Sequence, residues 1–266
     1  MKLDQFSLEV LNNLDVIWTF LLLMCRYFGL FIVLPGIGYG LGGMRIRAPA
    51  MFALSLAAMP MTKIAPLPEN ILIIAAMTGG EFIFGYILGV IPMLIVEGVK
   101  AGAQLATNTM GLSAANMFDP ATGTTSTDLA RLQGDLIILV FLLLGGHYIV
   151  IEAVSGLSGS FTPGLFVFDG FTSSFLINQL AKVFESAVMI SAPVVMALLL
   201  TQFVMGLISK AIPSVNIFIV SFPLTVGIGL LFTILALPEV VRYVVQEMSS
   251  LDNMLSVVIE NMTDIK

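Results

Sequence analysis

Two stretches in the second half of the chain run for more than 20 residues without a single charged side chain. They cover residues 186–209 and 211–238. About 20 apolar residues cross the hydrocarbon core of a bilayer as an α-helix. Only 11% of the 266 residues are charged and the mean hydropathy is +1.03, whereas about a quarter of a soluble domain is charged. The chain is therefore expected to be an integral membrane protein, and a large soluble catalytic domain is excluded.

Five apolar stretches are long enough to cross, or nearly cross, a membrane. They are Val16 to Leu34, Ile71 to Val96, Leu132 to Val154, Ser186 to Ser209 and Ser214 to Leu237. A sixth, Ala48 to Met59, is short for a span and is expected to form a re-entrant or buried helix. The predicted fold class is thus an all-α membrane protein with about five to six long hydrophobic helices.

Several of these stretches contain ionisable side chains. One more ionisable residue, Glu97, directly follows the stretch that ends at Val96. A charge at the bilayer centre costs about 2.5–3.5 kcal/mol on insertion scales, so such residues face a protein interior or a wet cavity. They could carry protons or ions, or they could pair with one another or with a neighbouring subunit and fix helix register. Spacing does not decide between these interpretations, and we favour pairing. The set is Arg26, Glu81, Glu97 and Asp135.

The remaining composition excludes several classes of function. The net charge of -6 leaves no basic patch for a nucleic acid. Gly38, Gly40 and Gly43 match GxGxxG, but a membrane-length helix precedes them in place of the required strand. His147 has no second ligand at metal-binding spacing, and no serine lies in a Gly-x-Ser-x-Gly elbow. We expect no enzyme activity, no cofactor and no metal.

Two segments outside the spans are predicted to pack against protein. Residues 101–127 are rich in Ser, Thr, Asn and Gly, yet they contain apolar side chains that should be buried. After Pro238, apolar residues recur every three or four positions, which predicts an amphipathic helix with a seam for a protein partner. The seam residues are Val241, Val244, Met248, Leu251, Leu255, Val258 and Met262.

The loop between the last two apolar stretches carries the most specific pattern. Residues 206–229 read GLISKAIPSVNIFIVSFPLTVGIG. Proline restricts its predecessor, so one helix should end near Ile212, with a break at 210–216. Asn216 is predicted to cap the next helix, while Pro223, Gly227 and Gly229 allow a bend and close helix approach.

This stretch resembles the signature of the FliR family, subunits of the flagellar type III protein export gate. The matching positions are Gly206, Lys210, Pro213, Asn216, Phe218, Phe222 and Pro223. Lys210 stands where the family more often has arginine. A second stretch, from Gly102 through Met110-Gly111-Leu112 to Phe118-Asp119-Pro120, is similar to the family's loop after its third hydrophobic segment.

The resemblance covers essentially the whole chain and implies a function. Members form, with FliP and FliQ, a gate of inclined helices in the bacterial inner membrane, at the flagellar basal body. Unfolded flagellar proteins leave through it, and FlhB and FlhA are expected as further partners. The family's loop corresponding to 106–122 is implicated in plugging the closed pore. The candidate plug residues here are Gln104, Met110, Gly111, Leu112, Met117, Phe118, Asp119 and Pro120.

The predicted organisation is a single helical export-gate domain over the whole chain. Its parts are N-terminal helices at 1–100, a loop or plug at 101–131, helices and hairpin at 132–238 and an amphipathic C-terminal helix at 239–266. Three alternatives stay open at this point. The chain could be a self-contained proton-coupled secondary transporter, a gate subunit of a virulence-type system, or a structural scaffold whose loop is inert.

Overall fold

The computed structural model describes residues 14–36, 41–112, 128–156, 162–166, 169–212 and 217–263. Among these residues the regular structure is entirely helical, without a strand. Contacts divide the chain into two compact units. Unit 1 comprises residues 1–93, 142–177 and 248–266, and unit 2 comprises 94–141 and 178–247. Each unit is therefore built from segments far apart in the sequence.

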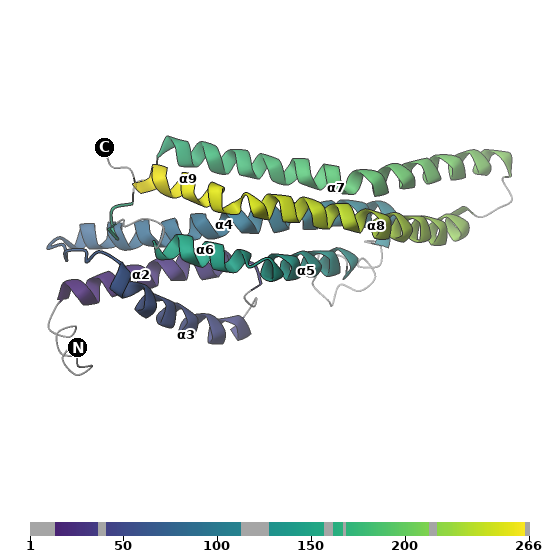
Figure 1. Cartoon of the computed structure of the whole chain (residues 1–266). Coiled ribbons are helices and arrows are strands. Elements are labelled where there is room, and N and C mark those ends of the chain that lie inside the picture. Colours follow the sequence, from purple (N-terminus) through teal and green to yellow (C-terminus); the bar gives the residue numbers. More distant parts are fainter. Residues whose placement is uncertain are drawn as a thin grey trace. The chain divides into compact units, whose positions relative to one another are not determined.

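The described helices are shown in Figure 1. In chain order they are α2 (Leu14–Val33), α3 (Leu41–Ala58), the 3₁₀ turn η1 (Met59–Met61), α4 (Ile71–Met110), α5 (Asp128–Leu143), α6 (Gly146–Ser155), α7 (Gly170–Ala211), α8 (Ile217–Ser249) and α9 (Leu251–Thr263).

Within the described residues, four helical segments are long and apolar enough to cross a membrane: α2, α4, α7 and the run Ile219–Met262. The bent pair α5 and α6 raises the number to five if it counts as one span. This confirms the predicted all-α membrane class. At 1.5 Å per residue, the 40 residues of α4 measure about 60 Å, roughly twice the hydrocarbon thickness. Several helices are thus far longer than the apolar stretches that predicted them.

In unit 1, α2 and the first part of α4 approach so closely that side chains are excluded from the contact. A Cβ atom on Gly29 would collide with the carbonyl oxygen of Phe82, and one on Gly85 with the carbonyl oxygen of Arg26. Small residues permit such backbone approach in membrane helix pairs, where packing replaces the hydrophobic driving force. Leu22, Leu23 and Leu30 of α2 and Leu88 of α4 are fully buried.

In unit 2, the end of α4 packs against α7 and α8. The core cluster contains Ala106 and Met110 of α4 together with Val194 and Leu198 of α7. Half-buried apolar side chains complete it, namely Leu112, Leu129, Ile228 and Phe232.

Helix boundaries differ from the sequence prediction in four places. The stretch 101–110 is helical and not loop, so α4 continues to Met110. Its threonines fit a helix because their hydroxyls donate back to main-chain carbonyls, Thr107 to Ala103 at 2.6 Å and Thr109 to Leu105 at 2.8 Å. α7 also begins earlier than the apolar stretch that predicted it, at Gly170 and not at Ser186.

The third difference is that Pro238 lies inside α8 and does not begin a separate tail helix. Membrane helices tolerate interior prolines because neighbouring groups can satisfy the freed backbone acceptors. Conversely, the predicted span 132–154 is interrupted at Gly145, whose φ of 73° separates α5 from α6. A left-handed residue of this kind is compatible with glycine but costly for other residues.

The amphipathic seam of the C-terminal region is buried, but its partner is the chain itself. In unit 1, α9 packs on α6, and Leu251, Leu255, Val258 and Met262 are all completely buried. The expectation of a separate protein partner for this stripe is corrected, because α6 supplies the apolar face that covers α9.

Candidate functional site

The last turn of α4 is where the predicted plug begins, and its anchor is Met110. This side chain is 1% exposed and lies in the unit 2 core. It fills space left open by Gly229 of α8, where a Cβ atom would lie 2.5 Å from the Met110 Cγ. Methionine suits such a site because its flexible thioether adapts to irregular gaps. Two segments that the sequence singled out separately are therefore in contact.

Polar side chains of α7 and α8 reach the final carbonyl groups of α4. Gln202 donates to the Thr109 carbonyl at 3.4 Å, and Thr225 donates to the Met110 carbonyl at 3.4 Å. The last carbonyls of a helix have no partner in the helix itself, so side chains from elsewhere can satisfy them. Both hydrogen bonds are long and therefore weak. They therefore stabilise the end of α4 only weakly.

Gly111 turns the chain out of α4. Its φ is +86°, a conformation that L-residues with a side chain rarely adopt. Its amide donates to the Asn108 carbonyl at 3.1 Å. The Phe222 ring lies beside it, 3.7 Å from the position that a Cβ atom would occupy. This geometry ends α4 at Met110.

The other candidate plug residues are only partly covered by the structure. Leu112 is half-buried against the unit 2 core. Gln104 is also half-buried, and its side-chain amide donates to the Asn108 side-chain oxygen at 2.8 Å. Met117, Phe118, Asp119 and Pro120 lie outside the described residues.

The predicted helix break before α8 is confirmed. α7 ends at Ala211, Ile212 is not helical, and α8 begins at Ile217. Pro213 and Asn216 lie outside the described residues, so the predicted Asn216 cap stays a prediction. Gly206, Lys210, Phe222 and Pro223 are all exposed on the described helices. Phe218 lies in the first turn of α8.

A buried ion pair lies in unit 1. The Arg26 Nε donates to the Glu81 Oε2 at 2.5 Å, with side chains only 1% and 2% exposed. The Arg26 guanidinium also donates to the Val154 carbonyl at 3.2 Å and lies 5.0 Å from the centre of the Phe84 ring. Burying such a pair requires good geometry and extra hydrogen bonds, and both are present here.

Glu81 has a second role, because its other carboxylate oxygen accepts from the Gly164 amide at 2.5 Å. The pair therefore connects α2 and α4 to the end of α6 and to the turn at 162–166. Phe166 of the same turn meets Phe84 edge-on, with ring centres 5.8 Å apart. Arg26 and Glu81 therefore pair with each other, which is the interpretation that the sequence analysis favoured.

The two other ionisable residues of the predicted set belong to unit 2. Glu97 accepts from Lys100 at 2.8 Å on the surface of α4. Asp135 is exposed on α5. Neither side chain is as deeply buried as those of Arg26 and Glu81. Among the described residues, no group of three or more His, Cys, Asp or Glu side chains could hold a metal ion.

Sequence reasoning did not single out three groups that complete these sites: Gln202, Thr225 and the Gly164 amide. Gln202 carried a usable signal, because it is a long polar side chain inside the uncharged stretch 186–209. The Gly164 amide carried no such signal, because a backbone group that binds a distant carboxylate leaves no mark in the sequence.

Comparison with known proteins gives a consistent result. The sequence model of "Bacterial export proteins, family 1" matches residues 17–251. The "Flagellar biosynthetic protein FliR" of Bacillus subtilis (strain 168) is 26% identical over 251 residues, which cover 90% of this chain and 93% of the relative. The protein of the same name from Aquifex aeolicus (strain VF5) is 26% identical over 235 residues, 87% and 90% of the two chains. The "Yop proteins translocation protein T" of Yersinia pestis is 24% identical over 224 residues, 82% and 85%.

Proposed function

Since the chain belongs to family 1 of the bacterial export proteins, we propose that it forms, with FliP and FliQ, the channel through which unfolded flagellar proteins cross the bacterial inner membrane. It is a type III export-gate subunit with membrane-spanning helices. The family consists of secretion-apparatus proteins and is not a known enzyme family. The observation that carries the proposal is the match across nearly the whole chain to relatives with flagellar names.

Exposed apolar surface supports assembly with other subunits. Only 33% of the apolar window of α7 and 11% of that of the run Ile219–Met262 is buried, compared with 61% for α4. When a helix is longer than the bilayer is thick and stands upright, lipid cannot cover all of its apolar surface. We propose that FliP and FliQ cover part of it, that FlhB and FlhA join the complex, and that the whole lies in the flagellar basal body.

The proposed partners can be tested by purifying the tagged full-length chain from its own membranes. FliP and FliQ should co-purify in fixed ratio, and deletion of the chain should abolish motility and filament secretion. A virulence-type gate subunit is the competing assignment, favoured by the Yersinia relative. A deletion strain that stays motile but no longer secretes virulence proteins would establish that alternative and refute the flagellar one.

We further propose that residues 106–122 plug the closed pore. Two features support this: Gly111 ends α4 at a defined residue, and the 3.4 Å hydrogen bonds from Gln202 and Thr225 are easily broken. Met110 serves as the anchor of the plug, because it is buried within its own chain. Leu112, Met117 and Phe118 supply apolar surface, whose burial at about 25 cal/mol per Å² is reversible.

Replacing residues 113–122 with a Gly/Ser segment of equal length should raise the ion conductance of membranes that contain the assembled gate. Apolar side chains that close the pore are then missing, while α4 and its anchor are kept. A Gly/Ser replacement of residues 157–161, which changes only Leu157 and Phe161, is the control and should leave conductance unchanged. A gate that assembles normally and conducts no better after the 113–122 replacement contradicts the plug assignment, and an inert scaffold loop would then be the better description.

A further inference from the structure

In unit 1, α3 has an exposed face that is apolar over most of its length. Between residues 48 and 58 the single polar residue is Ser55, which is buried and donates to the Met51 carbonyl at 2.7 Å. Within the described residues, α3 is not one of the helices that are long and apolar enough to cross a membrane. Its exposed face therefore suits a protein cover. The exposed positions between residues 48 and 58 are Ala48, Pro49, Phe52, Ala53, Leu56 and Ala57.

The start of α2 lies beside the segment that follows α3. The two helices pack on each other (Figure 1), and the Phe20 and Phe52 rings meet edge-on with centres 5.4 Å apart. Five residues before Phe20, the Asp15 Oδ1 accepts from the Leu67 amide at 2.9 Å. The helices are therefore antiparallel. Residues 1–13, which precede α2 in the same unit, join it next to the C-terminal end of α3.

Residues 1–13 contain an apolar stripe that matches the exposed face of α3 in spacing and length. The matching sets, each spaced by three and then four positions, are Leu3, Phe6 and Val10 in this segment and Pro49, Phe52 and Leu56 on α3. Apolar residues at this spacing lie on one face of a helix. As a helix, residues 1–11 measure about 16 Å, as do residues 46–56 of α3. Asn12 and Asn13 then precede α2, and asparagine favours turns and helix N-caps.

The charges of the two segments are opposite in sign. The charged residues of α3 are Arg45 and Arg47, both near its N-terminal end. Residues 1–13 carry one positive and two negative side chains, for a net charge of -1. When the two apolar sets lie side by side, Asp4 points to the end of α3 that holds the arginines. Complementary charges of this kind fix the register and direction in which two segments pack.

We infer that residues 1–11 form a helix that turns back at Asn12 and Asn13 and packs on the exposed face of α3. This helix runs parallel to α3 and antiparallel to α2. Val10 then lies beside Leu56, and Asp4 lies toward Arg45. The cover of α3 is therefore a segment of the same chain and not a neighbouring subunit. The inference goes beyond the proposed function, because the contact forms within one chain.

Disulfide formation in native membranes tests this register. Cys25 is the one cysteine of the sequence, so the cysteine pairs are placed in a full-length Cys25→Ala chain. Val10→Cys with Leu56→Cys should form a disulfide within one chain, because a disulfide requires Cα atoms within about 7 Å of each other. Val10→Cys with Ile46→Cys is the matched control, since Ile46 is 65% exposed but lies about 15 Å from Leu56 along α3. Absence of the first disulfide, or an equal yield in the control, would overturn the inference.

Charge reversal tests the direction of the helix on α3. Asp4→Lys should lower the yield of the disulfide between positions 10 and 56 by up to about five-fold, the range for one exposed ion pair. Adding Arg45→Glu should restore the yield. Glu9→Lys is the control and should have a smaller effect, because Glu9 lies over the uncharged part of α3. Equal losses in the two lysine variants, without rescue by Arg45→Glu, would contradict the proposed direction.

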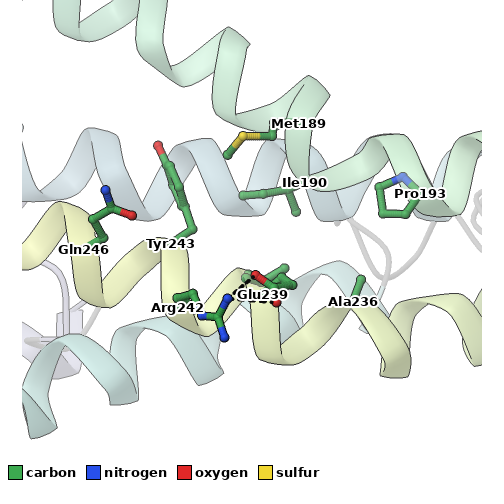
Figure 2. Close-up of a pocket in the computed structure, with 9 residues that line it drawn as sticks. Met189, Ile190, Pro193, Ala236, Glu239, Arg242, Tyr243 and Gln246 are labelled. Atoms are coloured by element: carbon green, nitrogen blue, oxygen red, sulfur yellow. Dashed lines mark hydrogen bonds and ion pairs between the residues drawn. The ribbon is translucent and has the colours of Figure 1, made fainter.

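A photoreactive residue at Phe52 identifies what covers α3 in intact membranes. Light should attach it to residues 1–11 of the same chain, whereas attachment to a lipid or to another subunit would overturn the inference. The matched control is Met189, which is also 52% exposed and borders the pocket between α7 and α8 (Figure 2). Attachment of residues 1–11 at Met189 as readily as at Phe52 would likewise overturn it. These readouts do not depend on whether the chain exports flagellar proteins, because they report the attached molecule and not secretion.

Discussion

The Arg26–Glu81 site in unit 1 and the end of α4 in unit 2 are both buried, but different forces hold them. At the first, a 2.5 Å ion pair is supported by a carbonyl, an amide and an aromatic ring. At the second, Met110 packs among apolar side chains, and the two side-chain hydrogen bonds measure 3.4 Å. Separating two buried charges costs several kcal/mol of free energy, whereas individual apolar contacts and weak hydrogen bonds cost little to break. The comparison shows that charge pairing stabilises the first site, whereas apolar packing and weak hydrogen bonds stabilise the second.

The largest effect is expected from Glu81→Ala. This change leaves the Arg26 charge buried without its carboxylate, which costs about 3–5 kcal/mol, and it also removes the acceptor of the Gly164 amide. We expect a large loss in the free energy of unfolding, measured by steric trapping in detergent micelles. Glu260→Ala, at an exposed position, is the control. If the two variants were equally stable, the ion pair would not be what fixes this part of unit 1.

A smaller effect is expected from Met110→Ala. It leaves a cavity beside Gly229 and should cost about 2 kcal/mol in the same measurement, at the low end for core truncations. Met196→Ala, whose wild-type side chain is 67% exposed on α7, should cost far less. Removal of the Met110 side chain should also increase the ion conductance of the closed gate, because the anchor of the proposed plug is weakened. Equal losses at Met110 and Met196 would show that the end of α4 is not anchored by packing.

The smallest effect is expected from Thr225→Val, which keeps side-chain shape and removes the weak hydrogen bond to the Met110 carbonyl together with the 3.0 Å bond to the Phe222 carbonyl of its own helix. Such a bond contributes about 1 kcal/mol or less. Amide hydrogen exchange at Gly111 should therefore accelerate about five-fold or less. Thr233→Val is matched, because the Thr233 hydroxyl bonds only within α8, to the Gly229 carbonyl at 2.8 Å. Faster exchange at Gly111 in the Thr233 variant alone would show that the Thr225 bond to the Met110 carbonyl does not stabilise the end of α4.

The sequence predicted the class of the fold and several of its boundaries, for identifiable reasons. Uncharged stretches locate helices because few other structures tolerate them in a membrane, and Pro213 located the break between α7 and α8. Proline was misleading at Pro238, where the helix continues. Small polar residues were misleading at 101–110, because threonine hydroxyls can bond within a helix.

The sites were harder to predict than the helices. Arg26 and Glu81 were detectable because each is costly in an apolar stretch, and each therefore requires a partner. Their actual partners also include the Gly164 amide and the Val154 carbonyl, and backbone groups carry no mark in a sequence. The burial of the α9 stripe was predicted correctly, but periodicity does not reveal which surface covers it.

The way unit 1 is assembled has a consequence for synthesis. Its segments are separated along the chain by the segments of unit 2, and α9 follows α6 by about 100 residues. During synthesis the apolar face of α6 is therefore made well before the helix that covers it. That face is exposed in the interval, so α6 reaches its final packing only after α7 and α8 have been made.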